Sequence, residues 1–155
     1  MRFCLVSDSH GNRGKLETVL EKGDYDYFFH MGDGINDLGL YSYVSQVYAV
    51  SGNCDYFGGE PNEKIITLCG KKILITHGNR YGVKSGLGIL YDYARTIGVD
   101  IVFYGHTHRQ QIDNIGGIYF VNPGTFKKND RGESHYLYLN ITEDGVTSED
   151  AFVWE

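Results

Sequence analysis

The sequence has little proline, little cysteine and no excess of positive charge. Only two of its 155 residues are proline and three are cysteine, an odd number without paired spacing. This argues against a disulfide framework and favours a reducing cytoplasm. The formal net charge of −6 argues against a strong nucleic-acid-binding surface. An affinity for phosphate would therefore have to come from bound cations.

The sequence also lacks an apolar run of the ~18 residues that a membrane-spanning helix needs. Residues 1–6 indicate a strand that begins at once, with no signal peptide before it. We therefore expect a cytoplasmic protein without a membrane segment, and homo-oligomerisation stays open. The length suits a single domain over residues 1–155 with a sizeable core.

Short apolar runs alternate with glycine-rich breaks, which predicts a layered α/β domain with one mixed sheet and one more antiparallel sheet. A helix at 85–98 should have Ser85 as its N-cap and Gly98 as its stop. Two further helices are expected at 14–22 and 35–45, the second weakened by Gly39. Strands are expected at 2–7, 25–31, 47–51, 64–68, 72–76, 99–104, 111–115, 118–121, 135–141 and 146–154.

Five of these strands are followed directly by polar motifs. The motifs are Asp8-Ser9-His10, Gly32-Asp33, Gly52-Asn53, His77-Gly78 and Gly105-His106-Thr107-His108. Sites in α/β proteins lie beyond the carboxyl ends of strands, so we expect the five strand ends to converge. One such motif alone would more often be an ordinary turn. The ordered set predicts a site for divalent transition metals, because imidazole and carboxylate suit these ions better than calcium or magnesium.

The ordered motifs resemble the calcineurin-like metallophosphoesterase family, whose blocks are D-x-H, G-D, G-N-H-[DE], a later H, and G-H-x-H. The resemblance extends over residues 1 to about 125. The short length and the segment Asn122-Pro123-Gly124-Thr125 resemble the small cytosolic phosphodiesterases of this family, which share their fold with a retromer scaffold subunit. The resemblance implies a four-layer α/β/β/α sandwich of two mixed sheets flanked by helices.

The resemblance also implies two divalent transition-metal ions, with manganese favoured and iron, zinc, nickel or cobalt as alternatives. Asp33 would bridge both ions, because a carboxylate has two oxygens that can serve two metals. The candidate substrate contacts are Asn12 and Asn53, and Asn12 could equally cap the helix that follows it. The implied metal ligands are Asp8, His10 and His108 for the first ion, and Asn53, His77 and His106 for the second.

The function implied is a metal-dependent phosphodiesterase that acts on a small phosphate ester with a metal-bridging hydroxide as nucleophile. Two alternatives stay open: a phosphomonoesterase, and a non-catalytic protein-interaction scaffold on the same fold. A scaffold should have eroded ligands, whereas all seven positions here carry chemically competent groups.

One motif departs from the family, since Gly52-Asn53-Cys54-Asp55 has cysteine where the commoner form has histidine. That histidine is usually assigned to assist the leaving group, so acid catalysis should be weakened here. Cys54 could donate a proton weakly, although packing is the simpler interpretation. Asp55 should turn the loop or support a neighbouring ligand.

Two further sets of side chains have open roles. His30 is expected beside the site, and His135 on the surface or on a strand. Five aromatic residues could stack on a substrate, although ordinary packing at the rim is the preferred interpretation. They are Tyr41, Tyr43, Tyr56, Phe57 and Tyr81.

Overall fold

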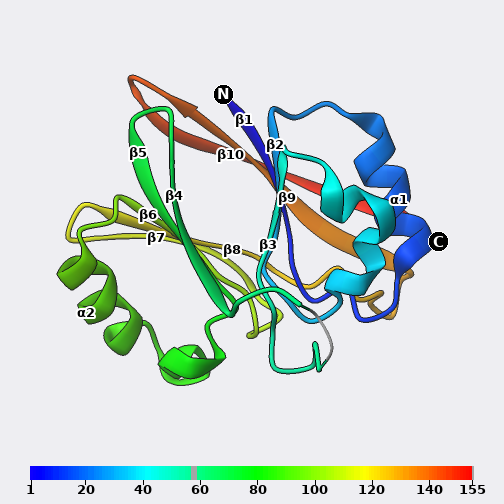
Figure 1. Cartoon of the computed structure of the whole chain (residues 1–155), viewed down its shortest axis with the longest axis horizontal. Coiled ribbons are helices and arrows are strands. Elements are labelled where there is room, and N and C mark those ends of the chain that lie inside the picture. Colours follow the sequence, from blue (N-terminus) through cyan, green and yellow to red (C-terminus); the bar gives the residue numbers. More distant parts are fainter. Residues whose placement is uncertain (57–58, 155) are drawn as a thin grey trace.

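The structure, a computed structural model, describes residues 1–56 and 59–154. Phe57 lies outside the described residues. Two five-stranded sheets face each other, and helical segments cover their outer faces (Figure 1). This is the four-layer α/β/β/α sandwich that the motif resemblance implied.

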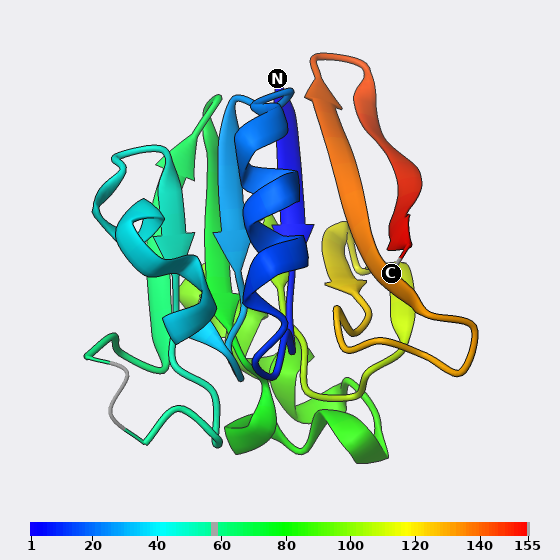
Figure 2. The ribbon, with the colours of Figure 1, turned by 90° about the vertical axis from the view of Figure 1, so that its right-hand side faces the viewer.

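The first sheet has the strand order β10-β9-β1-β2-β3. Its strands are β1 (Arg2–Val6), β2 (Tyr27–His30), β3 (Val47–Ala49), β9 (Glu133–Thr142) and β10 (Gly145–Trp154). The pairs β1–β2 and β2–β3 are parallel, whereas β9 is antiparallel to both β1 and β10. Helix α1 (Arg13–Lys22) and the 3-10 segment η1 (Ile35–Tyr43) cover its outer face (Figure 2).

The second sheet has the strand order β4-β5-β6-β8-β7. Its strands are β4 (Glu63–Leu68), β5 (Lys71–Thr76), β6 (Ile101–Phe103), β7 (Gln110–Ile115) and β8 (Ile118–Pro123), and α2 (Gly88–Ile97) covers it. Parallel pairs join β5, β6 and β8, while β4 and β7 are antiparallel edges. Both sheets are therefore equally mixed, and the expected more antiparallel second sheet was wrong. The reason is that β8 pairs in parallel with β6, and the C-terminal hairpin joins the first sheet.

Alternation along the strands builds three apolar layers. On β1, Phe3 and Leu5 face the other sheet, whereas Cys4 and Val6 face α1. Because this strand is buried on both faces, its sequence is a continuous apolar run. The layer between the sheets includes the aromatic pair Phe29 and Phe103, with ring centroids 5.0 Å apart. That layer holds the two sheets in one relative position.

Two details of the helices differ from expectation. Helix α2 begins at Gly88 after Leu87, and Ser85 instead ends a 3-10 turn, so the predicted N-cap was wrong. The predicted stop was correct, since Gly98 is left-handed with φ 73°. The expected helix at 35–45 is 3-10 in character, because Gly39 (φ 54°, ψ −131°) interrupts it.

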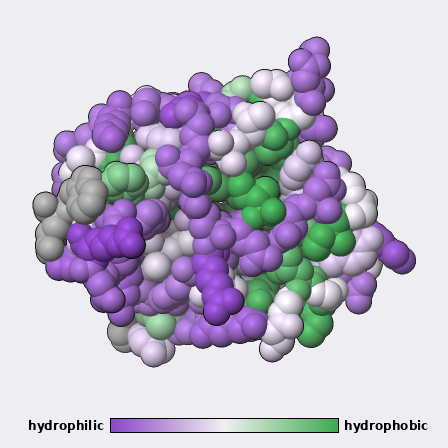
Figure 3. Space-filling model, turned by 180° about the vertical axis from the view of Figure 1, so that it is seen from behind, coloured by the Kyte–Doolittle hydropathy of each residue, from purple (hydrophilic) through white to green (hydrophobic). Residues whose placement is uncertain are grey.

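The face of the molecule seen from behind is mostly polar. Hydrophilic residues cover most of this face, and hydrophobic residues gather in a band across the right half of the view (Figure 3). None of the helices in the described part of the chain is long and apolar enough to cross a membrane.

Candidate metal centre

The parallel strands of both sheets run in one direction, downwards in Figure 2, and their carboxyl ends meet at one edge. The motif residues lie in the loops that leave these ends, as the sequence predicted. Asp8 follows β1, Asp33 follows β2, Asn53 follows β3, His77 follows β5, and His106 and His108 follow β6.

The backbone of these loops is unusual. Six non-glycine residues in the described chain have positive φ, and five of them are candidate metal ligands. They are Asp8 (55°), His10 (46°), Asp33 (60°), His106 (72°) and His108 (62°). Such conformations cost of the order of 1 kcal/mol or more each and concentrate at functional sites. The sixth, Cys69, lies in the turn between β4 and β5.

The glycines of the motifs are required by close approach of the loops. A Cβ on Gly52 would lie 2.6 Å from Asp33 N, and one on Gly105 would lie 2.9 Å from Asp8 Oδ2. A Cβ on Gly32 would lie 2.9 Å from His77 Nδ1. Only glycine lets these backbones come so close to the candidate ligands.

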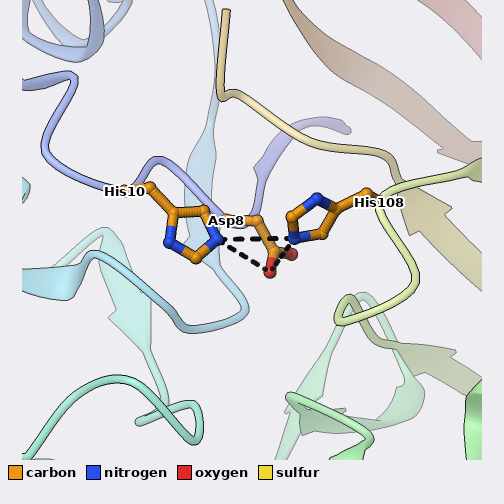
Figure 4. Close-up of side chains that lie close together, drawn as sticks. All are labelled: Asp8, His10 and His108. Atoms are coloured by element: carbon orange, nitrogen blue, oxygen red, sulfur yellow. Dashed lines mark hydrogen bonds and ion pairs between the residues drawn. The ribbon is translucent and has the colours of Figure 1, made fainter.

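Asp8, His10 and His108 form the first ligand group, and their side chains point toward one another (Figure 4). The Oδ1 atom of Asp8 lies 3.2 Å from His108 Nε2 and 3.6 Å from His10 Nε2. The two Nε2 atoms are 3.4 Å apart. Three ligand atoms therefore converge on one point.

The carboxylate of Asp8 provides a test of whether these residues fit a metal. Its Oδ2 accepts hydrogen bonds from Ser7 Oγ at 2.5 Å and from His106 N at 3.2 Å. Its Oδ1 is buried and accepts no hydrogen bond from the described part of the chain, although the Nε2 atoms of His108 and His10 lie beside it. A buried charged oxygen that accepts no hydrogen bond costs about 1–3 kcal/mol or more. A cation beside Oδ1 would remove that cost, so the group fits a divalent metal.

Asp33, His77 and His106 form the second ligand group. His77 Nε2 lies 3.2 Å from Asp33 Oδ2 and 3.1 Å from His106 Nδ1. His77 Nδ1 lies 2.7 Å from the carbonyl oxygen of Met31, to which it donates. This hydrogen bond fixes the ring and leaves Nε2 as the atom that can bind a metal.

Asp33 connects the two groups. Its carboxylate and His77 belong to the second group, and it also lies with His10 and Cys54 in a third set whose ligand atoms are all within 4.8 Å. Burial opposes ionisation of Asp33, but hydrogen bonds from His77 and from Cys54 N hold the pKa of its carboxyl well below the ordinary value. A permanently ionised carboxylate at this position suits a bridge between two cations.

The histidines of the second group have opposite shifts. Burial opposes protonation of His77, but contacts with Asp33 and Asp8 outweigh it and raise the pKa of His77. Burial and the neighbouring His77 lower the pKa of His106. The neighbouring carboxylates therefore favour the protonated form of His77, with which a metal would have to compete.

Asp55 supports the loop of Asp33. Its Oδ2 accepts from Asp33 N at 2.7 Å and from Gly52 N at 2.8 Å. Its Oδ1 accepts from Gly34 N at 2.8 Å and from Ile35 N at 3.2 Å. Asp55 therefore both turns its own loop and fixes the neighbouring one, which combines the two roles expected for it.

His30 lies beside the site, as expected, and is completely buried. Its Nδ1 accepts from Gly32 N at 3.1 Å, and its Nε2 lies 2.9 Å from Ser9 Oγ. Ser9 donates to Asp37 Oδ2 at 2.6 Å, and Gly11 N donates to the same oxygen at 2.9 Å. This network fixes the backbone on both sides of His10. Burial lowers the pKa of His30 to about 4, so the ring is neutral at pH 7.

The sequence reasoning assigned no role to three supporting residues, although Asn122 and Thr125 belong to the segment that carried the resemblance. Asn122 donates to Gly105 O at 3.2 Å and to Thr107 Oγ1 at 2.9 Å, and Thr125 donates to Asp8 O at 3.0 Å. A polar residue at the end of an apolar strand was a usable signal for Asn122. Asp37 had no such signal.

The candidate substrate contacts are less central. The amide of Asn12 donates to Phe126 O at 3.1 Å and to Ser134 Oγ at 2.8 Å, and it does not cap α1. Asn53 is exposed next to the site, and its amide lies 3.5 Å from Cys54 Sγ. Both contacts with substrate stay predictions.

The described aromatic loop residues divide into two kinds. Tyr41 packs against the layer under α1, and Tyr81 stacks on Tyr93, so both pack at the rim. Tyr43 and Tyr56 are exposed by 86% and 83% and are free to meet a ligand.

His135 is a half-buried residue of β9, as expected for a strand residue, and its Nε2 lies 3.4 Å from Glu133 Oε2.

Comparison with known proteins defines the family. Residues 1–144 match the calcineurin-like phosphoesterase superfamily domain, and the chain belongs to this superfamily. The probable metallophosphoesterase YsnB of Bacillus subtilis is 32% identical over 151 residues, which are 95% of this chain and 88% of that protein. The motif resemblance is thereby confirmed.

Solved structures agree with the family assignment. A predicted phosphoesterase from Streptococcus pneumoniae has a TM-score of 0.81 and 27% identity, covering 98% of this chain and 97% of that one. An archaeal phosphodiesterase shares the fold, with a TM-score of 0.78 and 19% identity over 99% of this chain and 100% of that one. Zinc-complexed Vps29 from Entamoeba histolytica also shares it, with a TM-score of 0.74 and 22% identity over 98% of this chain and 99% of that one.

Gly52→Ala should disturb the site directly, because its Cβ would collide with Asp33. We expect a loss of about 1–3 kcal/mol in the free energy of unfolding and a clear fall in manganese affinity. Gly14→Ala is the control, since nothing lies within 4 Å of its Cβ, and it should keep metal affinity unchanged. Urea unfolding measures the free energy of unfolding, and calorimetric titration measures the manganese affinity. Equal stability and equal affinity in the two variants would contradict the close approach of Gly52 to Asp33.

The buried His30 should make stability depend on pH. Its pKa is about 4 in the folded protein and about 6.5 in an unfolded chain. Between these values only the unfolded state takes up the proton, so the free energy of unfolding falls as the pH falls from about 6.5 to about 4. The lowered pKa of Asp33 acts in the same direction, at lower pH.

Over the same pH range, we expect the free energy of unfolding of His30→Gln to fall by about 3 kcal/mol less than that of the wild type. Urea unfolding of the metal-free protein at a series of pH values measures it. His135→Gln, at a half-buried position of β9, is the control and should keep the wild-type profile. If His30→Gln keeps that profile as well, the buried ring is not the source of the pH dependence.

Proposed function

We propose that this metallophosphoesterase is a phosphodiesterase that works with two divalent transition-metal ions, manganese being the first candidate, on a small phosphate ester. The observation that carries the proposal is the coincidence of strain and ligand chemistry. Five left-handed backbone positions fall on candidate ligands, and one of these ligands has a buried oxygen that accepts no hydrogen bond from the described residues. A structural role alone explains neither feature.

The residues of the chain would divide the work in a simple way. Asp8, His10 and His108 would hold one ion, and His77 and His106 the other, with the exposed Asn53 added through its side-chain oxygen. Asp33 would contact both. When bound, two such ions supply an activated hydroxide and stabilise negative charge on the phosphoryl oxygens. The hydrogen-bond networks of His30 and Asn122 would keep the ligands oriented.

A preference for diesters with good leaving groups rests on Cys54. Its thiol lies within 4.8 Å of ligand atoms of His10 and Asp33, where the commoner family motif has a histidine. Desolvation and the nearby Asp33 raise the pKa of Cys54, so the thiol is a weak proton donor at neutral pH. The archaeal phosphodiesterase of the same fold supports the choice of diesters over monoesters.

A protein-interaction scaffold is the second candidate. The hydrophobic band in Figure 3 is a surface that a partner could cover, and Vps29 proteins have this fold. The two candidates differ in what they require of the ligands. Substitution of Asp33 should abolish phosphodiester hydrolysis if the site is catalytic, whereas a scaffold would show no metal-stimulated turnover of any phosphoester before or after the substitution.

The number of metals tests the bridging role. Elemental analysis of the wild-type protein should give two ions per chain, and Asp33→Asn should hold fewer and lose at least about a hundredfold in activity. Asp144→Asn, in the exposed turn between β9 and β10, is the control and should keep both ions. An Asp33→Asn protein with two ions and full activity would refute the bridge.

The replacement of histidine by Cys54 predicts a steep dependence on the leaving group. Aryl diesters should be hydrolysed faster than alkyl diesters, and the rate should fall strongly as the pKa of the leaving group rises. Cys54→His should flatten this dependence, and Cys54→Ala should leave it steep. A leaving-group series measured on all three proteins decides the matter. An unchanged slope in Cys54→His would mean that acid assistance has another source.

A further inference from the structure

A basic pocket adjoins the first ligand group on the side of His10. Its volume is about 290 Å³, and three of its seven lining residues are lysines: Lys15, Lys127 and Lys128. None of the seven is acidic, although the chain as a whole has a formal net charge of −6. His10 itself forms part of the lining, so the pocket adjoins the candidate metal centre.

The loop that carries Lys127 is anchored to the metal centre. Lys127 N donates to Thr125 Oγ1 at 3.0 Å, and Thr125 donates to Asp8 O at 3.0 Å. Phe126 N donates to Ser7 O at 2.9 Å, and Asn12 holds Phe126 from the other side. The backbone of this basic wall is therefore fixed relative to the candidate ligands.

Helix α1 supplies another part of the lining. Lys15 lies in its first turn, is half-buried, and its Nζ reaches Gly132 O at 3.4 Å. The first turn contains no acidic residue, and no side chain caps it. The positive end of the helix therefore adds to the field of the lysines. Positive charge from two segments far apart in the sequence converges on one pocket.

We infer that this pocket binds a second anionic group of the substrate. The preferred substrates would be phosphodiesters that carry an additional phosphate on the arm lying over His10. This inference rests on the proposed function, because the first phosphate must bind at the metals. The lysines are partly exposed, so each should contribute modestly, and together they should favour such substrates by roughly tenfold.

The test compares ligands that differ only in the second anion. An alkylphosphonate and the alkane bisphosphonate of the same chain length are titrated by calorimetry into the manganese-loaded protein. The wild type should bind the bisphosphonate about tenfold more tightly. Lys15→Gln/Lys127→Gln should lose most of this gain and keep its manganese and its affinity for the monophosphonate. Lys22→Gln, at the far end of α1, is the control and should behave as the wild type.

Three results would overturn the inference. The gain could persist in the double variant, or the monophosphonate could lose affinity equally, which would indicate a structural effect. Inorganic phosphate could also bind the metal-free protein in a manner that depends on Lys127, which would indicate a site for free phosphate. Failure of the proposed function is read separately, from absent manganese uptake or absent diester hydrolysis in the wild type, since the calorimetric comparison needs no turnover.

Discussion

Burial of one apolar layer between the two sheets determines where every candidate ligand lies. Phe3 and Leu5 of the first sheet and Ile75 and Phe103 of the second belong to this layer. Side chains alternate along a strand, so a register shift of one residue would turn these groups out of the layer. The positions at which the parallel strands leave the sheets are therefore fixed. This fixes contacts between loops of the two sheets, such as the 3.2 Å distance between Asp33 Oδ2 and His77 Nε2.

The edge where the strands end is unfavourable by itself. Within the described chain it collects two carboxylates, four imidazoles, a buried carboxylate oxygen that accepts no hydrogen bond, and five left-handed residues. The three apolar layers offset these costs and so allow the edge to persist in the folded protein. A bound cation would relieve the electrostatic part, and by linkage it would stabilise the folded state in proportion to its affinity. Stability and metal binding are thus expected to be coupled in this chain.

The sequence predicted the parts of the structure that depend on local pattern. Continuous apolar runs identified the buried strands, and the order of the motifs identified the residues that converge at the edge. Ser85 was wrong because a hydroxyl two residues before the true N-cap, Leu87, was read as the start of α2. The role of Asp37 and the position of Lys15 and Lys127 around one pocket could not be predicted, because both depend on segments that meet only after the sheets have packed. Tertiary contacts of this kind leave no periodic signal in one sequence.

The supporting hydrogen bonds bear on the choice between an enzyme and a scaffold. Asp55, Asn122, Thr125 and the His30–Ser9–Asp37 network each fix a different loop of the same edge. A scaffold requires only that the sheets pack, and the apolar layers already provide that. Precise orientation of several loops is useful where ligand atoms must hold ions in one geometry. The basic pocket beside His10 is held in the same way, because the loop that carries two of its lysines is fixed to Asp8 at the end of β1. An anion bound there would therefore have a defined position relative to the metals.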